Sequence, residues 1–407
     1  MDSTSTQLAA ALEPLAVSSK RKAAQGDGAA AAAAAAEKRS RPSRTVLVFG
    51  TGECAQLGLG EDRLERKFPT RVDLPDTVAR IECGGSHSVV VTDDGALWTW
   101  GCNDEKALGR TGDEWVPGPV SLSVHIVKVS AGDSHSLALS QDGVVYAWGA
   151  YRDAQGMMGF TPGTEEPSAA PTPMKFGTRR LRAVDIASGA NHSLALLENG
   201  DMYEWGHIRI GQKVFRHRRG GLLVPRLVNV KRTEKLVKIF AGAYHSWAVS
   251  KSGKVFAVGL NQYCQAGLDG PENLHALTYV PGLDGALKLS GGLHHSLALL
   301  PSGQVYAFGR NNYGELGMND LNERRTPTLV PGLKDIAEVA CGSTHSLAVD
   351  KDGHVYSCGF GDQLQLGSGS VEDRKSFERV GGAALEALRV VSASAGSQFT
   401  LLLAEPR

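Results

Sequence analysis

The stretch GDSHSLALSQDGVVYAWG, residues 132–149, contains one complete copy of the unit from which this chain is built. It begins with Gly-x-x-His-Ser, continues as an apolar run, reaches Asp142-Gly143 and ends with Trp148-Gly149. An Asp-Gly pair supplies the positive φ that tight β-hairpins require. The unit therefore predicts a strand, a tight turn and a second strand.

Both halves of this unit recur along the chain. The first half keeps its histidine in six copies and has phenylalanine in a seventh: His87, His135, His192, His245, His295, His345 and Phe399. The second half, an aromatic or apolar residue before glycine, also occurs seven times, at Gly50, Gly101, Gly149, Gly206, Gly259, Gly309 and Gly359. Successive glycines lie 48 to 57 residues apart, within reach of propeller repeats.

The two halves are out of step at the ends of the chain. The copy at Gly50 precedes every histidine copy, and the copy at Phe399 follows every glycine copy. A closed ring would pair these two orphans as its last blade, which a linear array would not need. We therefore predict an all-β fold, a seven-bladed β-propeller of four-stranded blades over residues 45–407, with its sheet edges protected by radial repetition.

Residues 1–44 differ from the rest in composition, with seven basic and four acidic residues and a run of alanines. This segment has too little bulky apolar surface to fold alone, so we expect a disordered basic tail. Two basic clusters predict a bipartite nuclear-import signal, carried by Lys20, Arg21, Lys22, Lys38 and Arg39. Lys38, Arg39 and Arg41 are also candidates for contact with DNA phosphates. A merely solubilising tail is the alternative. No stretch of the chain is apolar enough to predict a membrane span.

The two x residues of each Gly-x-x-His copy precede a strand, so all seven pairs should gather at one face around the central channel. The second x residue is polar in every copy. Asp133 is the single acid in either column, and His294 is the single imidazole. These two residues are candidates for partner contact, with a local cap or hydrogen bond as the alternative.

The repeats, together with segments 57–67, 102–110 and 127–156, resemble the regulator of chromosome condensation family, whose founding member is the nucleotide-exchange factor for the GTPase Ran. The resemblance covers nearly everything from Val46 to Leu403. It implies a Ran exchange factor that performs no covalent chemistry and needs no cofactor. It also implies a nuclear, chromatin-associated protein whose partners are Ran, the histones and DNA of the nucleosome, and an import receptor.

The segment after Trp148-Gly149 lacks the Gln-Leu-Gly turn seen in other copies. It consists of Tyr151, Arg152, Asp153, Ala154, Gln155 and Gly156. In the resembled family this place carries a β-wedge that pushes into the GTPase beside its nucleotide, so these residues are candidate GTPase contacts. An ordinary surface hairpin is the alternative.

Two departures from the family pattern bear on function. Asn191 stands where the resembled exchange factor has an acid. Asparagine keeps the hydrogen-bonding shape of that acid and lacks its charge. After Trp205-Gly206 the chain is rich in basic residues, and the family has a loop nearby that touches the nucleosome. Arg216, Arg218 and Arg219 are candidates for that contact, against a solvated basic loop.

The histidine that recurs in register is expected to be structural, buried and hydrogen-bonded to neighbouring backbone. The six copies lie on different blades, so they do not predict a metal site. The six cysteines show no metal-binding spacing and are expected to be reduced thiols.

Other classes of function remain as alternatives. A propeller of the same superfamily could be a chromatin- or protein-binding scaffold without exchange activity. An ultraviolet photoreceptor would need a cluster of tryptophans, and this chain has six, three of them before the repeat glycine. A propeller enzyme would need paired carboxylates or a nucleophile and base converging on the axis.

Overall fold

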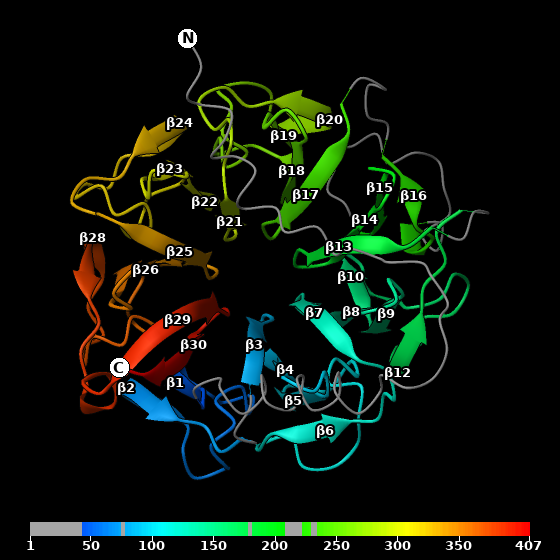
Figure 1. Ribbon diagram of the computed structural model, residues 1–407, viewed down its shortest axis with the longest axis horizontal. Helices are drawn as coiled ribbons and strands as arrows, with labels where there is room; N and C mark the ends of the chain where they lie inside the picture. The colour runs from blue at the N-terminus through cyan, green and yellow to red at the C-terminus, as the bar shows by residue number, and fades with distance from the viewer. Residues whose placement is uncertain (1–42, 75–77, 178–180, 208–221, 229–233) are drawn as a thin grey trace, which may run out of the picture. The chain divides into compact units, whose positions relative to one another are not determined.

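The computed structural model describes residues 43–74, 78–177, 181–207, 222–228 and 234–407. Within these residues the chain forms seven four-stranded antiparallel sheets, the blades, arranged around a central channel (Figure 1). This confirms the predicted seven-bladed propeller. No helix in the described ranges has the length and apolarity that a bilayer crossing requires.

The blades follow one another along the chain, and the first strand of each lies nearest the channel. Blade 1 consists of β3 (Val78–Cys83), β4 (His87–Thr92), β5 (Leu97–Gly101) and β6 (Gly118–Val120). Blade 2 consists of β7 (Ile126–Ala131), β8 (His135–Ser140), β9 (Val145–Gly149) and β12 (Ser168–Pro173). Blade 3 consists of β13 (Ala183–Ser188), β14 (His192–Leu197), β15 (Met202–Gly206) and β16 (Arg226–Leu227). Blade 4 consists of β17 (Leu236–Ala241), β18 (His245–Ser250), β19 (Val255–Leu260) and β20 (Asn273–Tyr279).

The remaining blades repeat the pattern until the chain closes on itself. Blade 5 consists of β21 (Lys288–Gly291), β22 (His295–Leu299), β23 (Val305–Gly309) and β24 (Arg324–Leu329). Blade 6 consists of β25 (Ile336–Cys341), β26 (His345–Asp350), β27 (Val355–Gly359) and β28 (Arg374–Arg379). The closing blade consists of β29 (Leu388–Ala395), β30 (Phe399–Pro406), β1 (Thr45–Thr51) and β2 (Glu65–Arg71). A separate hairpin, β10 (Tyr151–Asp153) with β11 (Gly156–Gly159), follows β9, and a 3-10 turn spans Ala383–Leu385.

The closing blade joins the two ends of the propeller. Strand β1 pairs antiparallel with β30, with Leu47 opposite Leu402 and Phe49 opposite Thr400. This is the predicted pairing of the orphan half-repeats. Four hydrophobic residues of β1, Val46 to Phe49, are at most 1% exposed, so the contact buries apolar surface as well as forming a hydrogen-bonded ladder.

The glycines of the repeat occupy positions where any residue with a side chain would strain the backbone or clash with a neighbour. Gly143, in the turn between β8 and β9, has a φ of 78°, as a tight hairpin requires. Gly149 has a φ of 89°, and a Cβ atom added there would lie 2.3 Å from the carbonyl oxygen of Ser134. The sequence-based assignment of Gly143 to a hairpin turn is confirmed, and the close approach at Gly149 is an addition from the structure.

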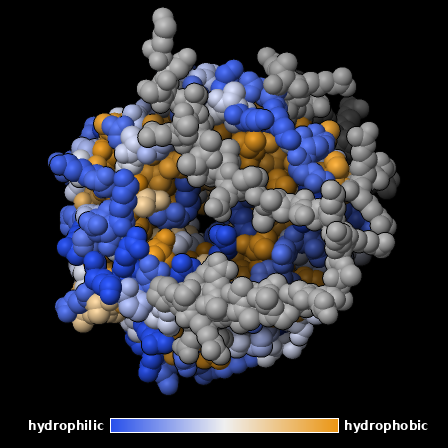
Figure 2. All heavy atoms as spheres, viewed as in Figure 1, coloured by the Kyte–Doolittle hydropathy of each residue, from blue (hydrophilic) through white to orange (hydrophobic). Residues whose placement is uncertain are grey.

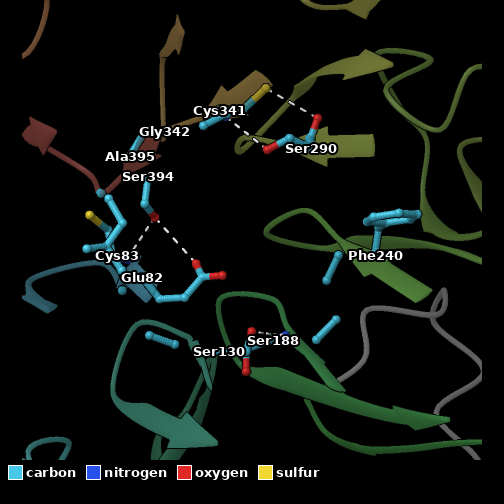
Figure 3. A pocket seen from close by; sticks show the side chains of 18 of the residues that line it. Glu82, Cys83, Ser130, Ser188, Phe240, Ser290, Cys341, Gly342, Ser394 and Ala395 are labelled. Atoms are coloured by element: carbon cyan, nitrogen blue, oxygen red, sulfur yellow. Dashed lines mark hydrogen bonds between the residues drawn. The ribbon is translucent and has the colours of Figure 1, made fainter. Parts of the chain in front are cut away.

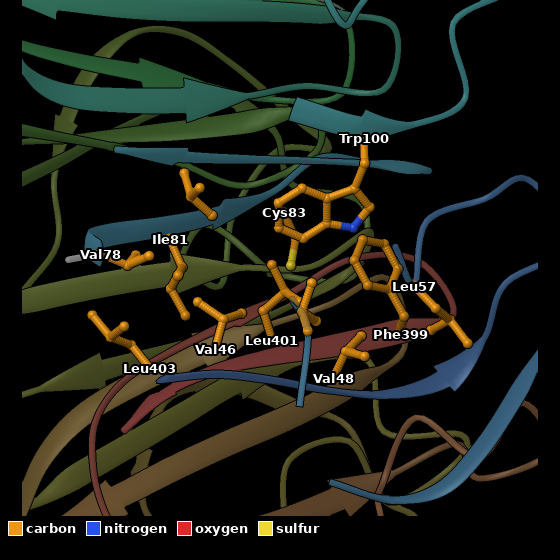
Figure 4. Packing of buried hydrophobic residues seen from close by; sticks show 12 residues of the cluster. Val46, Val48, Leu57, Val78, Ile81, Cys83, Trp100, Phe399, Leu401 and Leu403 are labelled. Atoms are coloured by element: carbon orange, nitrogen blue, oxygen red, sulfur yellow. The ribbon is translucent and has the colours of Figure 1, made fainter. Parts of the chain in front are cut away.

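Hydrophobic cores fill the spaces between neighbouring blades. Between the closing blade and blade 1, Trp100 and Leu57 pack against Val48, Phe399 and Leu401 (Figure 4). Each side chain of this size contributes about 1.5–3 kcal/mol when it is fully buried. Because the cores lie between sheets, the second strand of a blade is covered on both faces, and β8 is buried along its whole length.

The repeated histidine ties each blade to the next. In six places its Nε2 atom meets a hydroxyl of the following blade: His87 with Ser136, His135 with Ser193, His192 with Ser246, His245 with Ser296, His295 with Ser346 and His345 with Thr400, at 2.8–3.0 Å. The expected backbone contact, present for His87, His135 and His295, is thus joined by a side-chain hydroxyl that the sequence did not predict. Several of these hydroxyls donate onward to a loop carbonyl, as Ser346 does to Glu315 at 2.7 Å. Such a histidine must itself donate, which places its proton on Nε2.

Candidate functional site

One end of the channel is bordered by a ring of loops, the seven Gly-x-x-His turns. In each turn the first x residue donates its backbone N–H to the loop of the next blade. The seven donor–acceptor pairs close a circle: Gly85 to Gly132, Asp133 to Ala190, Ala190 to Ala243, Ala243 to Gly292, Leu293 to Ser343, Ser343 to Gly396 and Ser397 to Gly85, at 2.8–3.3 Å. The first x residues therefore gather at the channel mouth, as predicted.

The second x residue of each turn fixes the neighbouring long loop. Its carbonyl accepts the N–H of the residue that follows the repeat glycine, as His294 does from Arg310 at 2.9 Å and Asn191 from His207 at 2.6 Å. The same bond occurs in all seven blades. The Gly-x-x-His turns and the loops after the repeat glycines therefore form one continuous face, which we call the loop face.

The channel behind this face is lined by paired polar groups. Its cavity of about 570 Å³ is bordered by the innermost strands of the blades, and Figure 2 shows hydrophilic residues beside hydrophobic ones at the central opening. Lys128 pairs with Asp185, and Lys288 pairs with Glu338. Burial raises the pKa of Glu82, whose carboxylate lies 3.4 Å from the hydroxyl of Ser394.

Serine side chains also bind the innermost strands to one another in this cavity. Ser130 accepts the N–H of Ser188 at 2.8 Å, Ser290 accepts that of Cys341 at 2.9 Å, and Ser394 accepts that of Cys83 at 2.9 Å (Figure 3). Because these polar lining groups bond to one another, we assign them a structural role in holding the blades together. The candidate contact residues lie at its mouth.

The β10–β11 hairpin, which we call the wedge, is anchored in the core by its first residue. Tyr151 is 1% exposed, and its hydroxyl accepts Trp205 Nε1 at 2.6 Å and bonds Ser193 Oγ at 3.0 Å. In blade 2 the equivalent tryptophan and serine, Trp148 and Ser136, both donate to the carbonyl of Ala107. The Tyr151 hydroxyl thus replaces a loop carbonyl that the missing Gln-Leu-Gly turn would have supplied.

The outer part of the wedge extends beyond this anchor. Arg152 forms an ion pair with Glu105 of blade 1's long loop. Asp153 accepts the N–H of Gln155 at 2.8 Å and so shapes the tip. Ala154 and Gln155 are exposed, and Gly156 has a φ of 114° with no atom near the position of an added Cβ. The wedge therefore has a fixed base and an exposed tip.

Asn191 joins the wedge to Asp133. Its Oδ1 accepts the N–H of Arg152 at 2.8 Å, and its Nδ2 donates to Asp133 Oδ2 at 3.4 Å. Asp133 is exposed at the channel mouth, yet the protein atoms crowded around it desolvate the carboxyl and raise its pKa. An acid at position 191 could not donate this bond when ionised, so asparagine suits the arrangement found here.

The structure places His294 in a different sector from the other candidates. It lies between β21 and β22, in blade 5, whereas Asp133 belongs to blade 2. Its ring packs on Tyr263, with 4.9 Å between the ring centroids. The sequence-predicted residues thus form one group, Asp133 with Asn191 and the wedge, and one separate position, His294.

Sequence reasoning missed a group of side chains beside His294. Arg310 follows the repeat glycine of blade 5, and Tyr263, Tyr313 and Phe360 lie in neighbouring loops of the same face. A signal was available, because Arg310 is the one lysine or arginine among the seven residues that follow the repeat glycines.

The basic candidates lie outside the described residues. These are Lys20, Arg21, Lys22, Lys38, Arg39 and Arg41 of the tail, together with Arg216, Arg218 and Arg219. Their roles stay predictions. Among described side chains, Asp350, Asp352 and His354 could together reach a metal ion, but this group lies at the hairpin turn of blade 6, at the opposite end from the loop face.

Within the described residues, the strands and the ring of loops define a closed seven-bladed β-propeller whose Gly-x-x-His turns and long loops share one face. The sequence model of the RCC1-like domain family matches residues 45–402, and the chain belongs to this family.

Comparison with individual proteins agrees with this assignment. The regulator of chromosome condensation of Homo sapiens is 38% identical over 247 residues, which cover 56% of this chain and 58% of that protein. Prp20p of Saccharomyces cerevisiae, whose structure was described with its binding properties to Gsp1p and histones, matches with a TM-score of 0.83 at 28% identity, covering 90% of this chain and 93% of that one. Yeast RCC1 (Prp20) in its complex with Kap60 matches with a TM-score of 0.84 at 28% identity, covering 90% of each chain.

Proposed function

We propose that this protein is a guanine nucleotide exchange factor for the small GTPase Ran. The observation that carries the proposal is the wedge, which has an exposed tip and a base that is anchored through Tyr151 and linked to Asp133 through Asn191. A GTPase holds its nucleotide through a phosphate-cradling loop and magnesium, and an anchored projection of this kind would displace those elements. An exchange factor performs no covalent chemistry and requires no cofactor.

The mechanism follows from thermodynamic coupling. A partner that binds the nucleotide-free GTPase more tightly than the loaded form must weaken nucleotide binding by the same factor. The wedge would contribute this difference by occupying space beside the nucleotide. Asp133 would compete for a basic or backbone donor of the GTPase. Asn191 would hold the carboxylate of Asp133 next to the wedge. Such a factor speeds both release and loading, so the direction of exchange follows the cellular ratio of GTP to GDP.

The family relationship supports the proposal at a coarser level. The human relative bears the name regulator of chromosome condensation, and Prp20p was described with its binding to Gsp1p and histones. The aligned region spans 58% of the human relative's length. We extend the proposal to a nuclear, chromatin-associated protein that binds nucleosomal histones and DNA and is carried by an import receptor that recognises the basic tail.

The proposal is tested by measuring the release of a fluorescent guanine nucleotide from purified Ran, with and without this protein. Acceleration for Ran and none for an unrelated GTPase is the expected result. If the folded protein leaves release from Ran unchanged but binds nucleosomes, the scaffold alternative is the better account.

A further inference from the structure

Arg310 is attached directly to the turn that carries His294. It is the first residue after β23, and its backbone N–H donates to the carbonyl of His294 at 2.9 Å. Arg310 therefore belongs to the loop face, on the side opposite the wedge in blade order. Its side chain is 16% exposed, so part of it reaches solvent.

The guanidinium of Arg310 is held in place from three sides. Its Nε donates to Glu315 Oε1 at 3.3 Å. Its Cζ lies 5.9 Å from the ring centroid of Tyr263 and 5.9 Å from that of Tyr313, within the range of cation–π attraction. Neither Nη atom bonds to any residue in the described part of the chain, so two donor groups are left for an acceptor from outside.

Aromatic side chains extend this group across three blades. Tyr263 packs on His294, and Tyr313 packs on Phe360 with 4.8 Å between ring centroids. Tyr313 is 36% exposed. Tyrosine and arginine are enriched at the energetic centres of protein interfaces. Because these side chains already hold one another, binding would order few of them further. We call Tyr263, His294, Arg310, Tyr313 and Phe360 the arginine–aromatic patch.

The repeat itself does not require the ion pair beneath the patch. At the position of Glu315 three other blades have glutamine, Gln56, Gln265 and Gln365, and each uses its Oε1 to accept a loop N–H at 2.8–2.9 Å. Glu315 makes the same bond through Oε2, to Tyr313, at 2.7 Å. The glutamate adds a buried carboxylate, whose pKa burial raises and Arg310 lowers. The loop does not need the negative charge of Glu315. We therefore infer that this carboxylate serves to position Arg310.

We propose that the arginine–aromatic patch is a second anchor for the GTPase, and that Arg310 takes a carboxylate or backbone carbonyl of that partner. This inference rests on the proposed exchange function. The wedge and the patch then divide the task, because the wedge acts on the nucleotide site while the patch supplies affinity. Loss of the patch should therefore raise the exchange-factor concentration for half-maximal rate and leave the maximal rate intact.

The test compares variants that keep the loop folded. Arg310→Gln alone leaves the buried Glu315 without its cation, so the decisive variant is Arg310→Gln with Glu315→Gln, which restores the residue found in three other blades. Arg325→Gln is the matched control, because Arg325 is exposed on β24 and pairs with Asp269 and Glu323 at the rim. Nucleotide release from Ran is followed over a series of exchange-factor concentrations, and nucleosome binding is measured with the same proteins.

We expect the double variant to raise the half-maximal concentration by about tenfold, corresponding to loss of one charge-assisted contact, with an unchanged maximal rate and unchanged nucleosome binding. A wild-type half-maximal concentration in the double variant would overturn the anchor while leaving the exchange function intact. Weakened nucleosome binding with normal exchange would overturn it in favour of a chromatin contact. A wild-type protein without activity on Ran would remove the proposed function and this inference together.

Discussion

Asn191 has both ends of its amide engaged, one with the backbone of the wedge and one with Asp133. This explains why a neutral residue suits the position. The donor stabilises a carboxylate whose pKa is already raised by desolvation, whereas a second carboxylate would raise that pKa further. At the residue scale, one side chain contacts both the carboxylate of Asp133 and the backbone of the wedge.

Replacing Asn191 by leucine should lower the maximal rate of nucleotide exchange by about tenfold. The change removes two hydrogen bonds, and each contributes on the order of 1 kcal/mol. It also withdraws the donor that favours the ionised form of Asp133. The measurement is the maximal rate of release from Ran at neutral pH. Asn199→Leu, in a hairpin turn at the opposite end of blade 3, is the control, and an equal effect of both variants would contradict a role in the site.

At the element scale, the wedge is part of the blade packing rather than an appended loop. Tyr151 provides the acceptor that Trp205 needs, and its ring also lies 4.4 Å from that of His135. Movement of the wedge base would therefore disturb buried hydrogen bonds between blades 2 and 3. This is why the hairpin can project from the loop face and still resist displacement.

Tyr151→Phe should destabilise the protein by about 1–3 kcal/mol, because Trp205 Nε1 would be left buried without an acceptor. It should also lower the maximal exchange rate. Thermal unfolding checks the first effect and nucleotide release the second. Tyr146→Phe is a matched control, since no hydrogen bond of the Tyr146 hydroxyl occurs among the residues that the structure describes. A loss of stability with full exchange activity would show that the anchor does not serve the wedge.

The sequence predicted elements better than it predicted the contacts between them. Asp142-Gly143 and Trp148-Gly149 encode local backbone geometry, so turns and strands could be placed from short patterns. The partner of His87 is Ser136, 49 residues away, and no local pattern identifies it. Tyr151 was recognised as exceptional, but its burial depends on Trp205 of the next blade. Arg310 was missed because it stands out only through its contacts with Glu315 and two tyrosines, which the folded chain brings together.

At the scale of the whole molecule, closure by β1 joins seven units that do not each have a core of their own. Removing the chain up to Val72 deletes β1 and β2 and leaves β30 paired with β29 alone. The four buried hydrophobic residues of β1 are each worth about 1.5–3 kcal/mol, which together approach the net stability of a typical domain. We expect this deletion to abolish cooperative unfolding.

A protein that begins at Ser43 is the control for this deletion. It should keep the melting temperature of the full chain within about two degrees, because the closing blade stays complete. Circular dichroism during heating provides the measurement. If the protein that lacks residues up to Val72 still unfolds in a cooperative transition, the ring does not need its closing blade.

The ring of buried histidines should make the protein sensitive to acid. Burial lowers the pKa of His87 and His192 to about 4, and that of His135, His295 and His345 to about 3. In the unfolded chain these histidines bind protons near pH 6.5, whereas in the folded chain they stay neutral at that pH. Stability is therefore fully present above about pH 6.5 and falls as the pH drops toward 4, by up to about 1.4 kcal/mol per pH unit for each histidine.

Urea unfolding between pH 7.5 and 5 checks this dependence. His295→Phe, which copies the phenylalanine at position 399, should lower stability at pH 7.5 because a hydrogen bond is lost, yet it should reduce the slope with pH. An unchanged slope would assign the acid sensitivity to other groups.

In the proposed mechanism, the wedge converts binding of Ran into release of its nucleotide. The most direct measurement is stopped-flow release of fluorescent GDP from Ran, comparing the wild-type protein with a variant in which Gly-Gly replaces residues 152–157 and Tyr151 is kept. We expect wild type to accelerate release. The variant should keep its affinity for nucleotide-bound Ran through the rest of the loop face, bind nucleotide-free Ran more weakly, and lose about tenfold or more of the maximal rate. Equal acceleration by the two proteins would contradict the account.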